Sequence, residues 1–173
     1  MYEQLLIIGC GNLLRGDDAV GPVLVRRLLE LGLPPGVGVA DARTSGMDGA
    51  FRIRGIDQVK FVEAPPTGGA PGTVYAVPGS VVEHLPPLTG INLHAFRWDH
   101  ALAFGRWLLK DAYPRSVQVY LIEGADFTIG APLSSAVAAR MEDLAQHLSR
   151  NPWQPYLGHH IVDEDRNNGE LAA

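Results

Sequence analysis

Two carboxylates and one imidazole stand where predicted strands or loops end, and together they could bind a metal ion or support hydrolysis. Asp18 follows a glycine-rich loop after the first predicted strand, and Glu63 closes the third predicted strand. His94 lies on a third connection, ahead of a predicted helix, with His100 close by as an alternative. Carboxylate and imidazole groups on one rim are typical ligands of divalent first-row metals and can also serve a hydrolytic step. Asp18, Glu63 and His94 are therefore our candidate site residues.

The glycine-rich loop before Asp18 also allows two other interpretations. A dinucleotide site needs a G-x-G-x-x-G loop whose backbone N–H groups approach a pyrophosphate. Gly9 and Gly11 fit this pattern, but Leu14 occupies the third glycine position. The adjacent acids Asp17 and Asp18 would also repel phosphate at the start of the helix. Alternatively, both acids only cap the helix, where the helix dipole favours negative charge. In the site hypothesis, Asp17 mainly supports the loop.

Short apolar runs alternate with amphipathic stretches, as in an α/β protein whose sites form at the carboxyl ends of parallel strands. We expect strands over residues 4–8, 37–41, 59–63, 73–77 and 117–122. We expect helices over residues 20–31, 47–56 and 98–110 and within 131–150. The fourth strand follows a turn rich in proline and glycine and could run antiparallel at the sheet edge. The order predicts a three-layer α/β/α domain over 1–150 with a five-stranded, mostly parallel sheet, and a flexible tail over 151–173.

The composition of the chain limits which kinds of protein it can be. Of the 173 residues, 46% are hydrophobic and 19% are charged, which fits one globular domain. The 14 Lys and Arg residues against 19 Asp and Glu residues give a net charge of −5, so we expect neither a nucleic acid nor a membrane as partner. The single cysteine, Cys10, excludes an internal disulfide framework and fits a reducing compartment. With no secretory signal and no membrane span in the sequence, we expect a cytoplasmic protein. Separately, we expect a monomer.

The residues around Asp18 also resemble a known family. The run G-C-G-N-L-L-R-G-D-D-A-V-G-P over residues 9–22 is similar to the N-terminal signature of the hydrogenase maturation proteases. In that signature a G-x-G-N loop leads into a D-[DE]-x-x-G helix start. Other segments that follow in the family's order are Asp41 with 44–47, the strand 59–64, 71–74, His94 and 119–124. The resemblance covers roughly residues 4–149.

The resemblance implies an activity and a fold. Members of the family are endopeptidases that remove a C-terminal extension from the precursor of the [NiFe] hydrogenase large subunit after nickel insertion. Their twisted, five-stranded sheet with one antiparallel strand is phosphorylase/hydrolase-like. By position, Asp18, Glu63 and His94 would be the catalytic residues and the contacts to the nickel. The nickel would be recognised on the substrate rather than held as a permanent catalytic metal, and the chemistry would be that of an aspartic-type peptidase.

One residue of this chain departs from the family pattern, and one alternative to the protease activity is open. The acid that ends the third strand is commonly Asp in the family, whereas here it is Glu63, whose side chain is one methylene longer. The alternative to a protease is a non-catalytic maturation chaperone that binds the nickel-loaded large subunit without cutting it.

Overall fold

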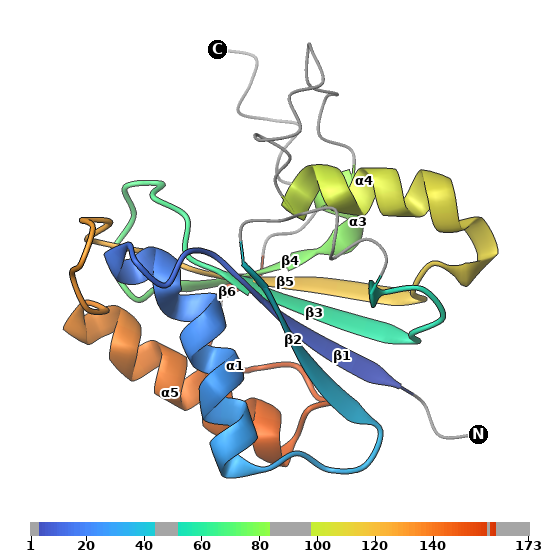
Figure 1. Cartoon of the computed structure of the whole chain (residues 1–173), viewed down its shortest axis with the longest axis horizontal. Coiled ribbons are helices and arrows are strands. Elements are labelled where there is room, and N and C mark those ends of the chain that lie inside the picture. Colours follow the sequence, from blue (N-terminus) through green and yellow to red (C-terminus); the bar gives the residue numbers. More distant parts are fainter. Residues whose placement is uncertain (1–3, 44–51, 84–97, 159, 162–173) are drawn as a thin grey trace.

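Helices cover both faces of a twisted β-sheet in the computed structural model of the chain (Figure 1). The structure describes residues 4–43, 52–83, 98–158 and 160–161. The strands are β1 (Leu5–Cys10), β2 (Val37–Arg43), β3 (Gln58–Glu63), β4 (Val74–Pro78), β5 (Ser116–Ile122) and β6 (His160–Ile161). The helices are α1 (Val20–Leu31), α3 (Gly79–Glu83), α4 (Trp98–Leu109) and α5 (Ser135–Arg150), with short 3₁₀ helices η1 (Gly16–Ala19) and η3 (Lys110–Ala112).

The strand order is β2-β1-β3-β5-β4-β6. β1 pairs in parallel with β2 and β3, and β3 pairs in parallel with β5. β4 is antiparallel to β5, because the connection over residues 64–73 contains no helix that could carry the chain back to the opposite end of the sheet. The predicted mostly parallel sheet with one antiparallel strand is thus confirmed. The two-residue β6 pairs with β4 and adds a short strand beyond it.

Several predicted boundaries agree closely with the structure. The predicted helix over 20–31 coincides with α1, and α4 ends one residue before the predicted end. The last helix, α5, begins only at Ser135, because Ser134 before it is extended, with φ −62° and ψ 153°. Residues 47–51 of the predicted helix over 47–56 lie outside the described residues, and in the described half only Arg52 is helical, with a turn over 53–55.

Two buried clusters fill the space between the sheet and its helices. On one face, β1 and β5 side chains pack with Leu24 of α1 and Leu144 of α5, both fully buried. On the other face, Phe61 of β3 packs with Leu102 of α4 and their neighbours. Since successive strand residues point to opposite faces, Phe61 and Val62 belong to different clusters. This division is the three-layer arrangement expected from the sequence.

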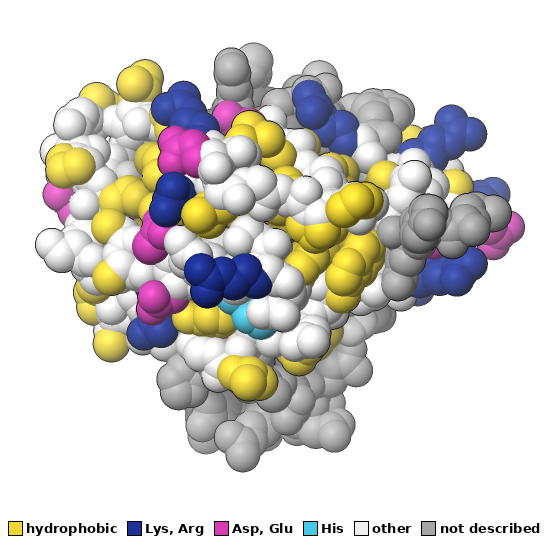
Figure 2. Space-filling model, turned by 90° about the horizontal axis from the view of Figure 1, so that it is seen from below, with side chains coloured by type: hydrophobic (Ala, Val, Ile, Leu, Met, Phe, Trp, Pro, Cys, Tyr) yellow, Lys and Arg dark blue, Asp and Glu magenta, His cyan; other side chains and the backbone are white. Residues whose placement is uncertain are grey.

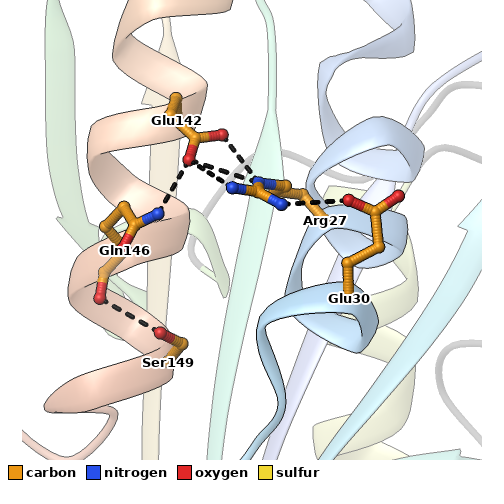
Figure 3. A network of polar contacts seen from close by, with 5 residues as sticks. All are labelled: Arg27, Glu30, Glu142, Gln146 and Ser149. Atoms are coloured by element: carbon orange, nitrogen blue, oxygen red, sulfur yellow. Dashed lines mark hydrogen bonds and ion pairs between the residues drawn. The ribbon is translucent and has the colours of Figure 1, made fainter.

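An ion-pair network joins α1 and α5, which lie side by side on one face of the sheet (Figure 3). Arg27 makes two parallel hydrogen bonds to the Glu142 carboxylate, from Nε to Oε2 and from Nη2 to Oε1, each 2.9 Å long. Gln146 also donates to Glu142, at 2.8 Å, and Glu30 accepts from Arg27 at 3.0 Å. The hydrogen bonds from Arg27 first, and from Gln146 second, lower the pKa of Glu142 to about 2.

Replacing Glu142 with glutamine is expected to weaken the pH dependence of stability in acid. A carboxyl whose pKa falls on folding stabilises the protein above its unfolded value, here 4.5, and this contribution is lost as the pH falls toward about 2. The effect should be small, because the Arg27 and Glu142 side chains are 32% and 41% exposed and solvent screens their charges. Urea unfolding near neutrality and at about pH 3 measures this difference. An identical loss of stability in both proteins would contradict the assignment.

The described part of the predicted tail packs against the sheet. The buried Lys60 of β3 donates from Nζ to the carbonyl oxygens of Pro152 and Gln154, at 2.6 and 3.1 Å. Burial lowers the pKa of Lys60 to about 8. The buried ring of Tyr156 meets Tyr120 edge-on, with 6.4 Å between ring centroids. The domain boundary at residue 150 and the flexible tail stay predictions, and residues 159 and 162–173 lie outside the described residues.

Candidate functional site

Three loops meet at the carboxyl end of the parallel strands, where the sequence predicts the site. They cover residues 11–19, 64–73 and 123–134, following β1, β3 and β5 (Figure 1). Asp18 lies in η1 on the first loop, and Glu63 is the last residue of β3. The structure therefore has both predicted acids at this edge, one in the loop that follows β1 and one at the end of the neighbouring β3.

Close packing of α1 against the strand ends brings these two segments together. A Cβ atom on Gly21 would lie 2.2 Å from the carbonyl oxygen of Cys10 and 2.6 Å from that of Val62. Only glycine allows the start of α1 to rest on β1 and β3 in this way. A Cβ on Gly11, which has φ +126°, would lie 1.8 Å from the carbonyl oxygen of Asp18. Contacts within the chain thus account for Gly11, one of the two glycines that fit the dinucleotide pattern, and this weakens the dinucleotide interpretation.

Asp18 is half-buried beside its own loop. Burial raises the pKa of its carboxyl group, while the positive charge of Arg15 and a hydrogen bond from the backbone of Asn12 act in the opposite direction without cancelling the effect. A raised pKa makes the ionised form a stronger base than an ordinary aspartate. Asp18 is therefore suited to take a proton from a reacting water.

Glu63 lies near two other groups at the strand ends. Burial first, and then the negative charges of Glu63 and Asp41, raise the pKa of the Cys10 thiol well above its ordinary value. Cys10 is buried at the end of β1, between strands β2 and β3 that carry the two acids. A thiol in these surroundings stays protonated, so Cys10 is a poor nucleophile. This agrees with a structural role for Cys10 at the end of β1.

Asp17 supports the loop rather than capping the helix. Its carboxylate is fully buried and accepts hydrogen bonds from the backbone N–H groups of Ala125, Asp126 and Ser134, at 2.7, 2.9 and 2.6 Å, and from the Ser134 hydroxyl at 2.9 Å. Burial by itself raises the pKa of Asp17, but these hydrogen bonds lower it by more than burial raises it. The pKa of Asp17 therefore lies below its ordinary value. Neither η1 nor α1 has a side-chain cap, so the capping hypothesis is wrong for Asp17.

A second buried carboxylate, Glu123, has a role that the sequence analysis did not predict. It follows β5, and its side chain accepts hydrogen bonds from the Thr67 hydroxyl at 2.5 Å and from the Gly68 N–H at 2.9 Å. Its backbone also exchanges hydrogen bonds with Gly72 and Thr73 at 2.8 Å each. Glu123 therefore anchors the 64–73 loop, as Asp17 anchors the 123–134 loop. The signal in the sequence was an acid directly after an apolar strand.

The predicted histidine cannot be compared with the two acids, because His94 lies outside the described residues. The alternative, His100, lies in the first turn of α4. Within residues 4–43, 52–83, 98–158 and 160–161, no group of three His, Cys, Asp or Glu side chains is arranged to hold a metal ion. The metal-contact role of Asp18, Glu63 and His94 thus stays a prediction. In the same part of the chain, no helix has the length and apolar character of a membrane span.

Comparison with known proteins adds a family and a fold. No family model matches the chain. Over 132 residues the chain is 32% identical to a hydrogenase maturation protease assigned in Methanocaldococcus jannaschii, covering 73% of this chain and 80% of that protein. The fold of this chain is similar to that of the hydrogenase maturating endopeptidase HybD from E. coli, with a TM-score of 0.71 and 23% identity. The match covers 84% of this chain and 89% of HybD.

A second solved structure has the same fold. This is the [NiFe] hydrogenase maturation protease HycI from Thermococcus kodakarensis, with a TM-score of 0.68 and 22% identity, covering 85% of this chain and 90% of that one. At these identities the two solved structures show the fold alone, whereas the sequence match to the Methanocaldococcus jannaschii protein shows the family relationship over 132 residues.

Proposed function

Because the chain belongs to the hydrogenase maturation protease family, we propose that it removes the C-terminal extension from the precursor of a [NiFe] hydrogenase large subunit after nickel insertion. The observation that carries this proposal is the 32% identity over 132 residues to a protein assigned as a hydrogenase maturation protease. The position of Asp18 and Glu63 at one edge of the sheet supports it. Both acids stand where an α/β sheet offers a site, beside loops anchored by Asp17 and Glu123.

The nickel ion is the feature of the substrate that the site recognises. A nickel held by thiolates of the precursor can accept further oxygen and nitrogen ligands, and Asp18, Glu63 and His94 would supply them. Binding through the metal then holds the adjacent peptide bond beside the same acids. Recognition of the nickel thus also brings the scissile bond close to the catalytic groups. A precursor without nickel lacks the ion that these side chains bind. The enzyme therefore cleaves only a large subunit that already contains nickel, and it needs no permanent metal of its own.

The cleavage step is hydrolysis of the aspartic type, with a carboxylate as general base. Water adds its oxygen to the carbonyl carbon of the scissile bond, and its proton passes to Asp18 or Glu63. The C–N bond then breaks, and the protonated carboxyl group returns this proton to the leaving nitrogen, which becomes an amine. The raised pKa of Asp18 supports its assignment as the base. We propose further that the enzyme works as a monomer in the cytoplasm.

The test is the intact mass of a nickel-loaded large-subunit precursor from the same genome before and after incubation with this protein. We expect loss of one discrete C-terminal peptide, and no loss from the precursor without nickel. An unchanged mass together with stable binding would overturn the protease assignment in favour of a chaperone that holds the loaded subunit. Absence of both cleavage and binding would overturn the choice of substrate.

A further inference from the structure

Two large hydrophobic side chains are exposed on the loops beside Asp18. Leu14 is 69% exposed and Ile129 is 77% exposed. Leu14 lies on the loop between β1 and η1, and Ile129 lies on the loop between β5 and α5. We call these two residues the rim pair. They come from distant parts of the sequence, so only the tertiary structure brings them to one place.

The backbones of the two loops are paired at this position. Arg15 and Ile129 form an antiparallel bridge, and the N–H of Gly130 donates to the carbonyl oxygen of Leu14 at 2.8 Å. In Figure 1 the blue loop before α1 and the orange loop before α5 lie together at one end of the sheet, and Figure 2 shows hydrophobic side chains exposed at the same end. The rim pair therefore belongs to one continuous structural unit.

Buried polar contacts hold this unit rigid. The Asp17 carboxylate lies beneath it and binds residues at both ends of the segment over 125–134. A Cβ on Gly16, which has φ +49°, would lie 2.1 Å from the carbonyl oxygen of Asp126, so the two loops are in direct backbone contact. Rigid, exposed apolar side chains bind a partner at little cost in conformational entropy.

We propose that the rim pair is a docking contact for the folded hydrogenase large-subunit precursor. The inference rests on the proposed function, because that function requires a folded protein to bring its C-terminal segment to Asp18. Leu14 lies between Asn12 and Arg15, whose backbones hydrogen-bond to the backbone of Asp18 at 3.1 and 3.0 Å, so the paired loops lie directly beside this acid. Burial of two side chains of this size against an apolar patch of the precursor stabilises the complex through the hydrophobic effect.

Two other exposed leucines provide a matched control. Leu29 is 64% exposed near the far end of α1, and Leu157 is 89% exposed in the segment after α5. A double variant with Leu14→Gln and Ile129→Gln and a control with Leu29→Gln and Leu157→Gln each remove two exposed apolar side chains. Thermal unfolding should be nearly unchanged in both, since exposed side chains contribute little to the core.

The experiment measures the affinity for nickel-loaded precursor by surface-based binding kinetics and its cleavage by intact mass. We expect the rim-pair variant to raise Kd and KM about tenfold or more, with kcat within about twofold of the wild type, because the contact is present before and during the reaction. The control variant should match the wild type.

The outcomes separate this inference from the proposed function. Equal affinity of the wild type and the rim-pair variant would overturn the docking contact, whether or not cleavage occurs. Equal weakening in both double variants would also overturn it, because a general loss of exposed apolar surface would then explain the result. Binding by the wild type without cleavage, weakened only in the rim-pair variant, would uphold the docking contact and refute the protease. Neither binding nor cleavage by the wild type would refute both.

Discussion

The Asp18→Asn variant is expected to lose at least about 100-fold in the rate of precursor cleavage, as general-base catalysis contributes about that much or more. Asparagine has nearly the same shape as aspartate, but its amide cannot accept a proton from water and binds a metal ion more weakly than a carboxylate. Because Asp18 is only half-buried, the variant should still fold. Initial rates with nickel-loaded precursor, measured by intact mass, provide the test.

The control for this experiment is Asp143→Asn. Asp143 lies on α5, and its side chain is 63% exposed, so the substitution removes one negative charge from the surface. Its cleavage rate should equal that of the wild type. Full activity of Asp18→Asn would refute the catalytic role of Asp18. Equal losses of cleavage rate in Asp18→Asn and Asp143→Asn would show that the loss comes from the change in net charge. Glu63→Gln should behave as Asp18→Asn does if both acids act on the same peptide bond.

The Asp17→Ala variant is expected to lose about 2–4 kcal/mol in the free energy of unfolding, since it leaves buried N–H donors of the 123–134 loop without an acceptor. The lowered pKa adds a pH dependence with a definite sign. A carboxyl whose pKa falls on folding stabilises the protein above its unfolded value, and this part is lost as the pH drops below that value. Urea unfolding at neutral and acidic pH measures both effects.

A matched substitution separates the buried contacts of Asp17 from a general effect of removing an aspartate. Replacing the exposed Asp143 with alanine should lower the free energy of unfolding by no more than about 0.5 kcal/mol. If Asp17→Ala unfolds at the same urea concentration as the wild type, the anchoring role of Asp17 is refuted. At a temperature where Asp17→Ala is still folded, a raised KM would indicate that the loop also positions the rim pair.

The sequence by itself determined most of the fold, since the relevant signals are local. The apolar face of residues 20–31 specifies an amphipathic helix because side chains three and four positions apart share one side, and α1 has those bounds. The short apolar runs specify buried strands, and the proline-rich and glycine-rich turn after Glu63 indicates the antiparallel β4. Because parallel strands end at one edge of a sheet, the order of the strands is enough to assign Asp18 and Glu63 to the same rim.

The tertiary structure alone decided what each of these polar and apolar groups does. Asp17 and Asp18 are identical neighbours in the sequence, but Asp17 is fully buried because residues 125–134 come to lie against it, more than a hundred positions away. The anchoring role of Glu123 and the bridge between Arg15 and Ile129, which brings the loops of the rim pair together, likewise depend on loops distant in the sequence. Local patterns specify helices because helical hydrogen bonds join residues four positions apart, and they specify strands because successive side chains alternate between the two faces. The full burial of one carboxylate beside a half-buried one depends on which loops the folded sheet brings together.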